Sequence, residues 1–277
     1  MLNGEIVHVS EARGGISAQV DHVQINGEAF VLKTDTEFNV NGEKLFQVEL
    51  ATIGLPHINI YDHPDLTPDQ MLMEEINAPS LNGPNFTNAN LTKLGQTLAR
   101  IHARSFDQFY APDQAGQLHS GEWSDFLSAM EKRASKTAGT IDNASDAVAS
   151  AMRKLRNQDS VPYVLCHGDV HGNNVFCTEQ GLILYDNNAD CLVATPCYDL
   201  AVIFGELLPG YRYGEENAQG TRDSERMEAF LDGYGELPTD FNDFIDDYVL
   251  LRLLARYPNK FVPHQDSTIK LLVDKQN

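Results

Sequence analysis

The hydrophobic pattern changes along the chain, from short β-prone runs near its start to helix-like spacing further on. Two β-prone runs, Ala18–Ile25 and Glu28–Lys33, are joined by Asn26-Gly27. Asn-Gly is the strongest short hairpin signal, because both residues tolerate the left-handed backbone of a tight two-residue turn. The pattern therefore predicts an antiparallel hairpin.

A helix is predicted next, over Gly42–Gly54, because the segment is rich in helix formers and is stopped by Gly54 and Pro56. Leu45, Val48 and Ala51 are expected to form its buried face.

A stretch rich in Asn, Pro and Gly, Asn77–Asn90, predicts a linker and the domain boundary. The following segment, Leu91–His102, has apolar residues at positions 91, 94, 98 and 101. This spacing is typical of one face of an amphipathic helix. Three later segments also show helix-like patterns: Trp123–Arg133, Arg226–Tyr234 and Phe241–Tyr257.

Composition places the chain among globular proteins. Its 277 residues are enough for two lobes or for one large domain, and 42% are hydrophobic. It contains no run of about 18 uncharged apolar residues and its start has no signal-peptide pattern, so we expect a cytoplasmic protein without a membrane partner. Four cysteines lie between positions 166 and 197 without a C-x-x-C pair. We expect free, largely buried thiols rather than a zinc site.

The charge is strongly acidic, with 40 acidic and 20 basic residues and a formal net charge of −20. Such a field repels nucleic acid and anionic membranes. It would attract cationic ligands, or it reflects a solvated surface suited to solubility or to a salty habitat. Both interpretations stay open at this point.

The chemistry-bearing segment is His167-Gly168-Asp169-Val170-His171-Gly172-Asn173-Asn174, followed by Asp186 twelve residues after Asn174. Asp169 can accept the proton of an attacking hydroxyl. Asn174 and Asp186 offer oxygen ligands that suit Mg²⁺ beside nucleotide phosphates. The spacing therefore predicts a phosphoryl-transfer site.

This segment resembles the H-G-D-x-x-x-x-N loop of the aminoglycoside phosphotransferase and choline kinase superfamily, a small-molecule branch of the protein-kinase fold. The resemblance spans roughly residues 12 to 205. It implies an α+β, two-lobed fold, with a small antiparallel-sheet lobe over residues 1–76 and a mainly helical lobe over residues 77–277. It also implies ATP and Mg²⁺ as cofactors.

The resemblance assigns roles in the first lobe. Gly14, Gly15 and Ser17 would cover phosphates through a flexible loop. Lys33 would bind the α- and β-phosphates. A helix glutamate would pair with it, for which Glu43 fits best and Glu49 is the alternative. Met71–Ile76 resembles the final strand and hinge of this lobe, where the backbone at Glu75 and Ile76 would bind the adenine edge.

In the second lobe, Asp199 in a Tyr-Asp-Leu-Ala segment is expected to support the Asp169 loop, and His102 to be a satisfied core histidine. Gly168 replaces the arginine with which protein kinases bind a phosphorylated activation loop. Only twelve residues lie between Asp186 and Asp199, which leaves no room for that loop. These features favour a constitutively active small-molecule kinase.

The expected reaction is transfer of the ATP γ-phosphate to a hydroxyl of a small molecule. The candidate acceptors are cationic molecules of the aminoglycoside, choline or ketosamine type. A fainter resemblance to fructosamine kinases is weakened by His171 and by Asn187-Asn188, which differ from that family. Two alternatives are a nucleotide-binding pseudokinase, and a metallophosphoesterase in which Asp169 and His171 hold metal. The intact Asp169, Asn174, Asp186 and Lys33 set argues against the pseudokinase. Against the metallophosphoesterase, the downstream G-D-x-x-D and G-N-H elements of that fold are missing.

Overall fold

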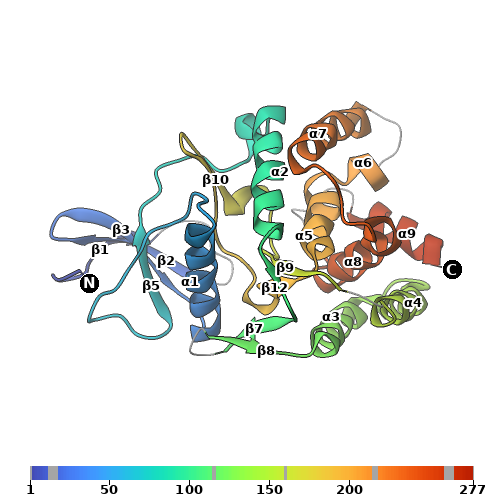
Figure 1. Cartoon of the computed structure of the whole chain (residues 1–277), viewed down its shortest axis with the longest axis horizontal. Coiled ribbons are helices and arrows are strands. Elements are labelled where there is room, and N and C mark those ends of the chain that lie inside the picture. The colour runs from blue at the N-terminus through green and yellow to red at the C-terminus, as the bar shows by residue number, and fades with distance from the viewer. Residues whose placement is uncertain are drawn as a thin grey trace.

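The structure is a computed structural model that describes residues 2–11, 18–113, 117–158, 161–213, 218–258 and 265–276. It has the predicted α+β architecture, with an antiparallel sheet and one helix followed by a mainly helical part (Figure 1).

The first sheet has five antiparallel strands in the order β1-β2-β3-β5-β4. Their bounds are β1 Val7–Glu11, β2 Gln19–Ile25, β3 Glu28–Thr34, β4 Ile60–Tyr61 and β5 Gln70–Glu74. The predicted hairpin is confirmed, because Ile25 pairs with Glu28 across a two-residue turn. Asn26 and Gly27 both have positive φ there, +53° and +84°, as this turn requires.

Helix α1 spans Glu37–Thr52 and packs beside the sheet (Figure 1). It begins before the predicted Gly42, because the Thr36 side chain caps it by accepting a hydrogen bond from Asn39 N. The predicted buried face was wrong at two of its three positions: Val48 is 57% exposed and Ala51 is exposed, whereas Leu45 is half-buried against the core.

The buried face of α1 instead combines apolar Phe46 and Leu50 with polar Glu43 and Gln47. Gln47 donates to Leu184 O and accepts from Ile58 N, both at 2.9 Å. A face that carries buried polar groups is invisible to a hydrophobic pattern, which is why the prediction failed.

Helix α2, Asn88–His102, begins inside the predicted linker, after the short 3₁₀ turn η1, Gly83–Asn85. Thr87 caps it by accepting from Asn90 N. Its predicted apolar face is confirmed, with Leu91, Leu94, Leu98 and Ile101 all fully buried.

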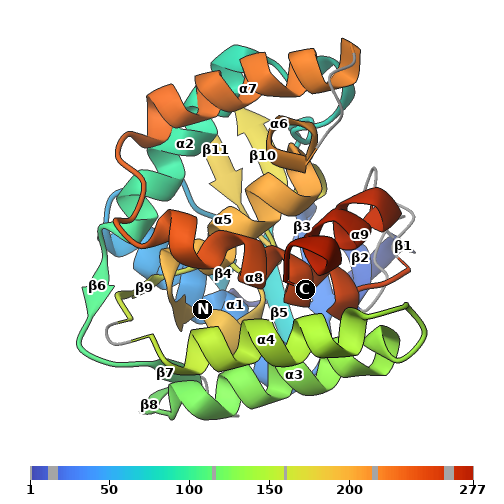
Figure 2. The same cartoon turned by 90° about the vertical axis from the view of Figure 1, so that its right-hand side faces the viewer.

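The remaining helices form the second, larger part. They are α3 Trp123–Ala138, α4 Ala144–Arg156, α5 Pro196–Val202, the π-helix η4 Ile203–Leu207, α6 Gly210–Tyr213, α7 Ala218–Tyr234, α8 Phe241–Ala255 and α9 Gln265–Gln276. Figure 2 shows α2 beside α7 on one side and the α3–α4 pair on the other, with α5 and α8 between them. All three later segments with helix-like patterns are thus helical over most of their length.

Short strands connect these helices. One sheet contains β6 Ser105–Phe106, β7 Tyr110–Pro112, β8 Leu118–Ser120, β9 Tyr163–Leu165 and β12 Val193–Ala194. A hairpin of β10 Val175–Thr178 and β11 Gly181–Leu184 lies between the 3₁₀ turns η2, Gly172–Asn174, and η3, Ala189–Cys191. This hairpin separates the two halves of the predicted phosphoryl-transfer segment.

Two glycines allow α2 and α7 to approach closely. A Cβ on Gly95 would lie 2.1 Å from Phe230 O, and one on Gly233 would lie 1.9 Å from Thr92 O. The Thr92 hydroxyl donates to Ala229 O at 2.9 Å. Backbone therefore contacts backbone here, which only glycine permits.

All four cysteines are free, and Cys166, Cys191 and Cys197 are buried, as predicted. In the described parts of the chain, every helix is too short or too polar to cross a bilayer.

Candidate active site

The loop after β9 is fixed by one buried carboxylate. Asp199, in α5, accepts from His167 N at 2.8 Å and from Gly168 N at 2.5 Å. Gly168 has a φ of +75°, and a Cβ on it would lie 2.1 Å from Cys191 Sγ. The expected supporting role of Asp199 is confirmed by these contacts.

Asp199 also contacts His102, whose Nε2 lies 3.2 Å from Asp199 Oδ2 and whose Nδ1 lies 2.7 Å from Tyr234 Oη. His102 is thus a satisfied core histidine, as expected. Burial alone would raise the pKa of Asp199, but the interactions with His102, together with those of His167, outweigh it and lower that pKa. The carboxylate therefore stays ionised and can hold the loop.

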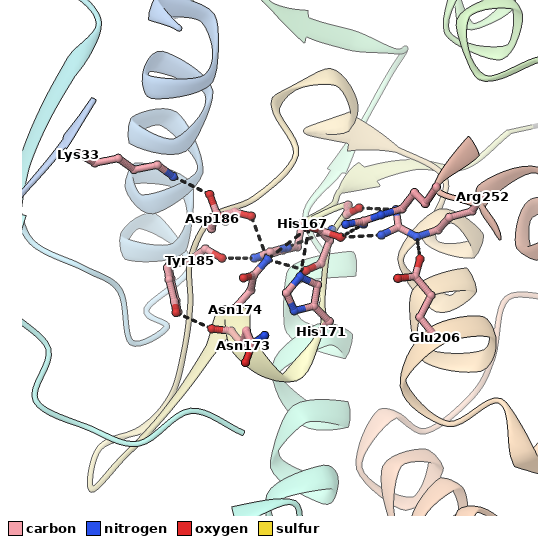
Figure 3. Close-up of polar contacts among 12 residues, drawn as sticks. Lys33, His167, His171, Asn173, Asn174, Tyr185, Asp186, Glu206 and Arg252 are labelled. Atoms are coloured by element: carbon pink, nitrogen blue, oxygen red, sulfur yellow. Dashed lines mark hydrogen bonds and ion pairs between the residues drawn. The ribbon is translucent and has the colours of Figure 1, made fainter. Parts of the chain in front are cut away.

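Lys33, on β3, binds two carboxylates. Its Nζ lies 2.6 Å from Glu43 Oε2. It also lies 2.6 Å from Asp186 Oδ1 (Figure 3). The other oxygen of Glu43 accepts from Asp186 N at 3.0 Å. Burial alone would lower the pKa of Lys33, but the charges of Glu43 and Asp186 outweigh it and raise that pKa. Glu49, the alternative partner, instead pairs with Arg104 at 3.0 Å.

Asn174 connects the two halves of the segment. Its Nδ2 donates to Asp169 O at 3.0 Å and lies 3.3 Å from Asp186 O (Figure 3). With the amide nitrogen engaged this way, Asn174 Oδ1 remains as an acceptor. The Asp186 side chain is 48% exposed, and its backbone has a φ of +57°, a conformation that non-glycine residues rarely adopt. An amide oxygen and a carboxylate are hard ligands that fit Mg²⁺.

Glu75 and Ile76, the expected adenine contacts, lie just after the last residue of β5. The Glu75 carboxylate lies 2.9 Å from His22 Nδ1. Ile76 is half-buried against the cluster that contains Met71 and Met73. Gly14, Gly15 and Ser17 lie outside the described residues.

Asp169 is enclosed by positive charge. Its Oδ1 accepts from Arg252 Nη2 at 2.6 Å and also from Arg256 Nη1, while Oδ2 lies 3.4 Å from His171 Nε2. Burial alone would raise the pKa of Asp169, but the His171 hydrogen bond and the charges of Arg252 and Arg256 together hold it well below its ordinary value. Asp169 is therefore ionised at any physiological pH.

Arg252, on α8, is itself buried. It donates to Gly168 O at 2.8 Å through Nη1 and to Glu206, in the π-helix η4, through Nε (Figure 3). Sequence reasoning missed Arg252, Arg256 and Glu206. The available signal was a charged residue within the apolar run Tyr248–Ala255, with a second arginine four residues later on the same helix face.

A cavity of about 470 Å³ opens beside Asp169, between α3 and α8. Lys33, Asn174 and Asp186 are not among its described lining residues. Asp169 thus lies between two regions, with the lysine and the two oxygen ligands in one and this cavity in the other.

The metallophosphoesterase alternative does not fit this geometry. Among the described residues, the only group of three or more metal-ligating side chains close enough to share an ion is His102, Cys166 and Asp199. Asp169 and His171 do not belong to such a group, and Asp169 binds two arginines instead.

Solved structures share this fold over nearly the whole chain. The choline kinase LicA from Streptococcus pneumoniae has a TM-score of 0.64 at 19% identity, covering 98% of this chain and 94% of its own. A spectinomycin phosphotransferase bound to ADP and spectinomycin has a TM-score of 0.58 at 17% identity, with coverage of 99% and 94%. A thermostable aminoglycoside phosphotransferase variant bound to ADP and hygromycin B has a TM-score of 0.62 at 16% identity, with coverage of 98% and 92%.

At these identities the structures establish the two-lobed, kinase-like fold alone. No curated protein sequence matches the chain. A sequence profile described as the phosphotransferase enzyme family, however, matches residues 8–238, which is most of the chain. The chain therefore belongs to the phosphotransferase enzyme family.

Proposed function

We propose that this protein transfers the γ-phosphate of ATP to a hydroxyl group of a small molecule. One observation carries the proposal. A continuous set of contacts runs from Lys33 through Asp186 and Asn174 to Asp169, and it joins a candidate phosphate clamp, two candidate magnesium ligands and a proton acceptor. Phosphoryl transfer requires these parts and little else.

The nucleotide would bind on the Lys33 side, with residues 1–76 as its lobe and residues 77–277 as the acceptor lobe. Lys33, held by Glu43, would contact the α- and β-phosphates. Asn174 and Asp186 would hold Mg²⁺, which neutralises charge on the phosphates when bound. Covering contacts are proposed for the backbone of Gly14, Gly15 and Ser17, and adenine contacts for Glu75 and Ile76.

On the other side, Asp169 would orient the acceptor hydroxyl and take its proton. The hydroxyl oxygen forms a bond to the γ-phosphorus, the bond between that phosphorus and the β–γ bridging oxygen breaks, and ADP leaves. Because the base contributes mainly position and charge, its low pKa is compatible with this role.

The family relationship supports this reaction class. The related structures bind ADP with spectinomycin or with hygromycin B, or are named a choline kinase, so a small hydroxyl-bearing acceptor is proposed here too. Four free thiols and ATP dependence fit a reducing cytoplasm.

Two substitutions test the proposal by separating the carboxylates. Asp169→Asn should keep Mg·ATP affinity, measured by calorimetry, and lose most turnover, roughly 10²–10⁴-fold. Asp186→Ala should weaken Mg·ATP binding itself, because it deletes an anionic oxygen ligand.

Wild-type protein that binds no Mg·ATP at millimolar nucleotide would contradict the proposal. Mg·ATP binding with no phosphorylated product from any acceptor would favour the pseudokinase alternative.

A further inference from the structure

The cavity between α3 and α8 has a charge unlike that of the whole protein. Among the residues that the structure describes, three arginines line it, Arg133, Arg252 and Arg256, together with two carboxylates, Asp169 and Asp190. The whole chain has twice as many acidic as basic residues, 40 against 20. Arginine is therefore concentrated beside the proposed base of an otherwise acidic protein.

Both of these described carboxylates are already bound to guanidinium groups. Arg133 Nη2 donates to Asp190 Oδ2 at 2.5 Å, and Asp169 Oδ1 accepts from Arg252 and Arg256. A cationic acceptor would have to share one of these carboxylates with an arginine that already binds it. It would also face the remaining arginines at close range, which is unfavourable in a partly buried site.

The two more accessible arginines keep hydrogen-bonding capacity. The side chains of Arg133 and Arg256 are 52% and 36% exposed. A guanidinium carries five N–H donors in a planar fork. Among the described residues, Arg133 gives one nitrogen to Asp190 and Arg256 gives one to Asp169. The remaining donors match a carboxylate or phosphate group, which guanidinium binds in bidentate geometry.

The rest of the lining is apolar and aromatic. Phe109, Phe126 and Tyr198 contribute rings, and Met130 lies beside them in α3. Phe126 is held in place by Trp123, with ring centroids 4.9 Å apart in a stacked arrangement. Such walls bury the carbon skeleton of a ligand, while a few polar groups fix its orientation.

From these observations we infer that the phosphate acceptor is an anionic alcohol, with a carboxylate or phosphate group, an apolar body and a hydroxyl that reaches Asp169. This inference rests on the proposed function and deepens it. It replaces the cationic acceptor suggested by the net charge of −20. Salt screens surface charges over about 8 Å at physiological ionic strength. The arginines that line the cavity therefore determine which charge of the acceptor is favoured.

Matched acceptors of different charge test the inference. The first series is 4-(hydroxymethyl)benzoate, 4-(hydroxymethyl)benzylamine and 1,4-benzenedimethanol. The second is 5-hydroxypentanoate, 5-amino-1-pentanol and 1,5-pentanediol. Each pair of acid and amine differs in charge at similar size. With Mg·ATP, kcat/KM for the acid should exceed that for the amine by at least about tenfold in one series or both, as one charge-assisted hydrogen bond provides.

The arginines should account for this preference. Arg256→Gln and Arg133→Gln should each reduce the ratio of acid to amine, whereas Arg256→Lys should keep part of it. Arg156→Gln is the matched control. Arg156 forms an ion pair with Glu131 at 2.7 Å and is not among the described residues that line the cavity. This variant should leave the ratio unchanged.

The inference is overturned if no acid is preferred in either series while Mg·ATP still binds, whether the amines are better, the charges are equal or no member reacts. An unchanged ratio in both glutamine variants overturns it too. Wild-type protein without Mg·ATP binding would instead overturn the proposed function, and the inference with it.

Discussion

The Arg252 guanidinium donates to the Asp169 carboxylate at 2.6 Å, from a helix that begins more than 70 residues later in the sequence. The same guanidinium binds Gly168 O and Glu206, so one buried side chain connects α8, the π-helix and the loop that carries the proposed base. The position of Asp169 thus depends on the C-terminal helices as well as on its own loop.

The low pKa of Asp169 predicts a specific pH dependence of stability. The ordinary pKa is 3.8, and the folded-state pKa lies below it. The unfolded chain therefore binds a proton at a pH where the folded protein does not, so stability present above about pH 4 is lost as pH falls further. Urea denaturation from pH 6 to pH 3 should show a steeper loss in wild type than in Asp169→Asn, by up to about 1.4 kcal/mol per pH unit.

The control for this experiment is Glu228→Gln, which alters an exposed carboxylate on α7. It should leave the acid slope as in wild type. Equal slopes in wild type and Asp169→Asn would contradict the assigned charge environment.

Removing the Arg252 charge should destabilise the protein strongly. Arg252→Met leaves Glu206, whose side chain is only 5% exposed, without its cation, at an expected cost of roughly 3–5 kcal/mol in the free energy of unfolding. The double variant Arg252→Met/Glu206→Gln should recover part of this loss, because the stranded charge is gone. Chemical denaturation of wild type, both single variants and the double variant gives the coupling energy between Arg252 and Glu206. If the two single losses simply add in the double variant, the two residues are not coupled and the prediction is wrong.

Asp199→Asn should loosen the Asp169 loop. The neutral amide accepts more weakly than the carboxylate that now binds two backbone N–H groups and His102, so a loss of about 1.5–3 kcal/mol is expected. Asp190→Asn breaks a partly exposed ion pair with Arg133 and should cost at most about 1 kcal/mol. Thermal and urea denaturation compare the two variants. Similar losses of stability would contradict the role of Asp199 in holding the Asp169 loop.

The contact between α2 and α7 predicts that Gly95→Ala destabilises the protein by about 1–3 kcal/mol, because the new methyl would meet Phe230 O. Gly139→Ala is the matched control. Gly139 follows α3 in helical backbone, and its nearest atom to a new Cβ is 3.9 Å away. The control should be neutral or slightly stabilising. A harmless Gly95→Ala would show that the helices are not in this close contact.

Local signals account for what the sequence could predict. The hairpin at Asn26-Gly27, the apolar face of α2 and the spacing of Asp169, Asn174 and Asp186 each depend on residues no more than 17 positions apart. The expected pair of Lys33 with Glu43 is present as well, and it came from resemblance rather than from periodicity.

Long-range and buried polar contacts account for what was missed. The face of α1 was wrong because polar Gln47 is buried, with hydrogen bonds to Ile58, 11 positions away, and to Leu184, 137 positions away. Arg252 and Arg256 reach Asp169 across more than 80 positions. Net charge did not indicate an arginine-lined cavity, since composition says nothing about where charges gather in space.

Transfer of an isotopic label tests the central claim most directly. Protein is incubated with Mg²⁺, ATP labelled with ¹⁸O in the γ-phosphoryl group, and the six matched alcohols together with a small-molecule cell extract, and products are identified by mass spectrometry. Wild type should give an alcohol that has gained one phosphoryl group with its three labelled oxygens, and Asp169→Asn should give almost none. Label found only in inorganic phosphate, or equal product from wild type and Asp169→Asn, would contradict the account.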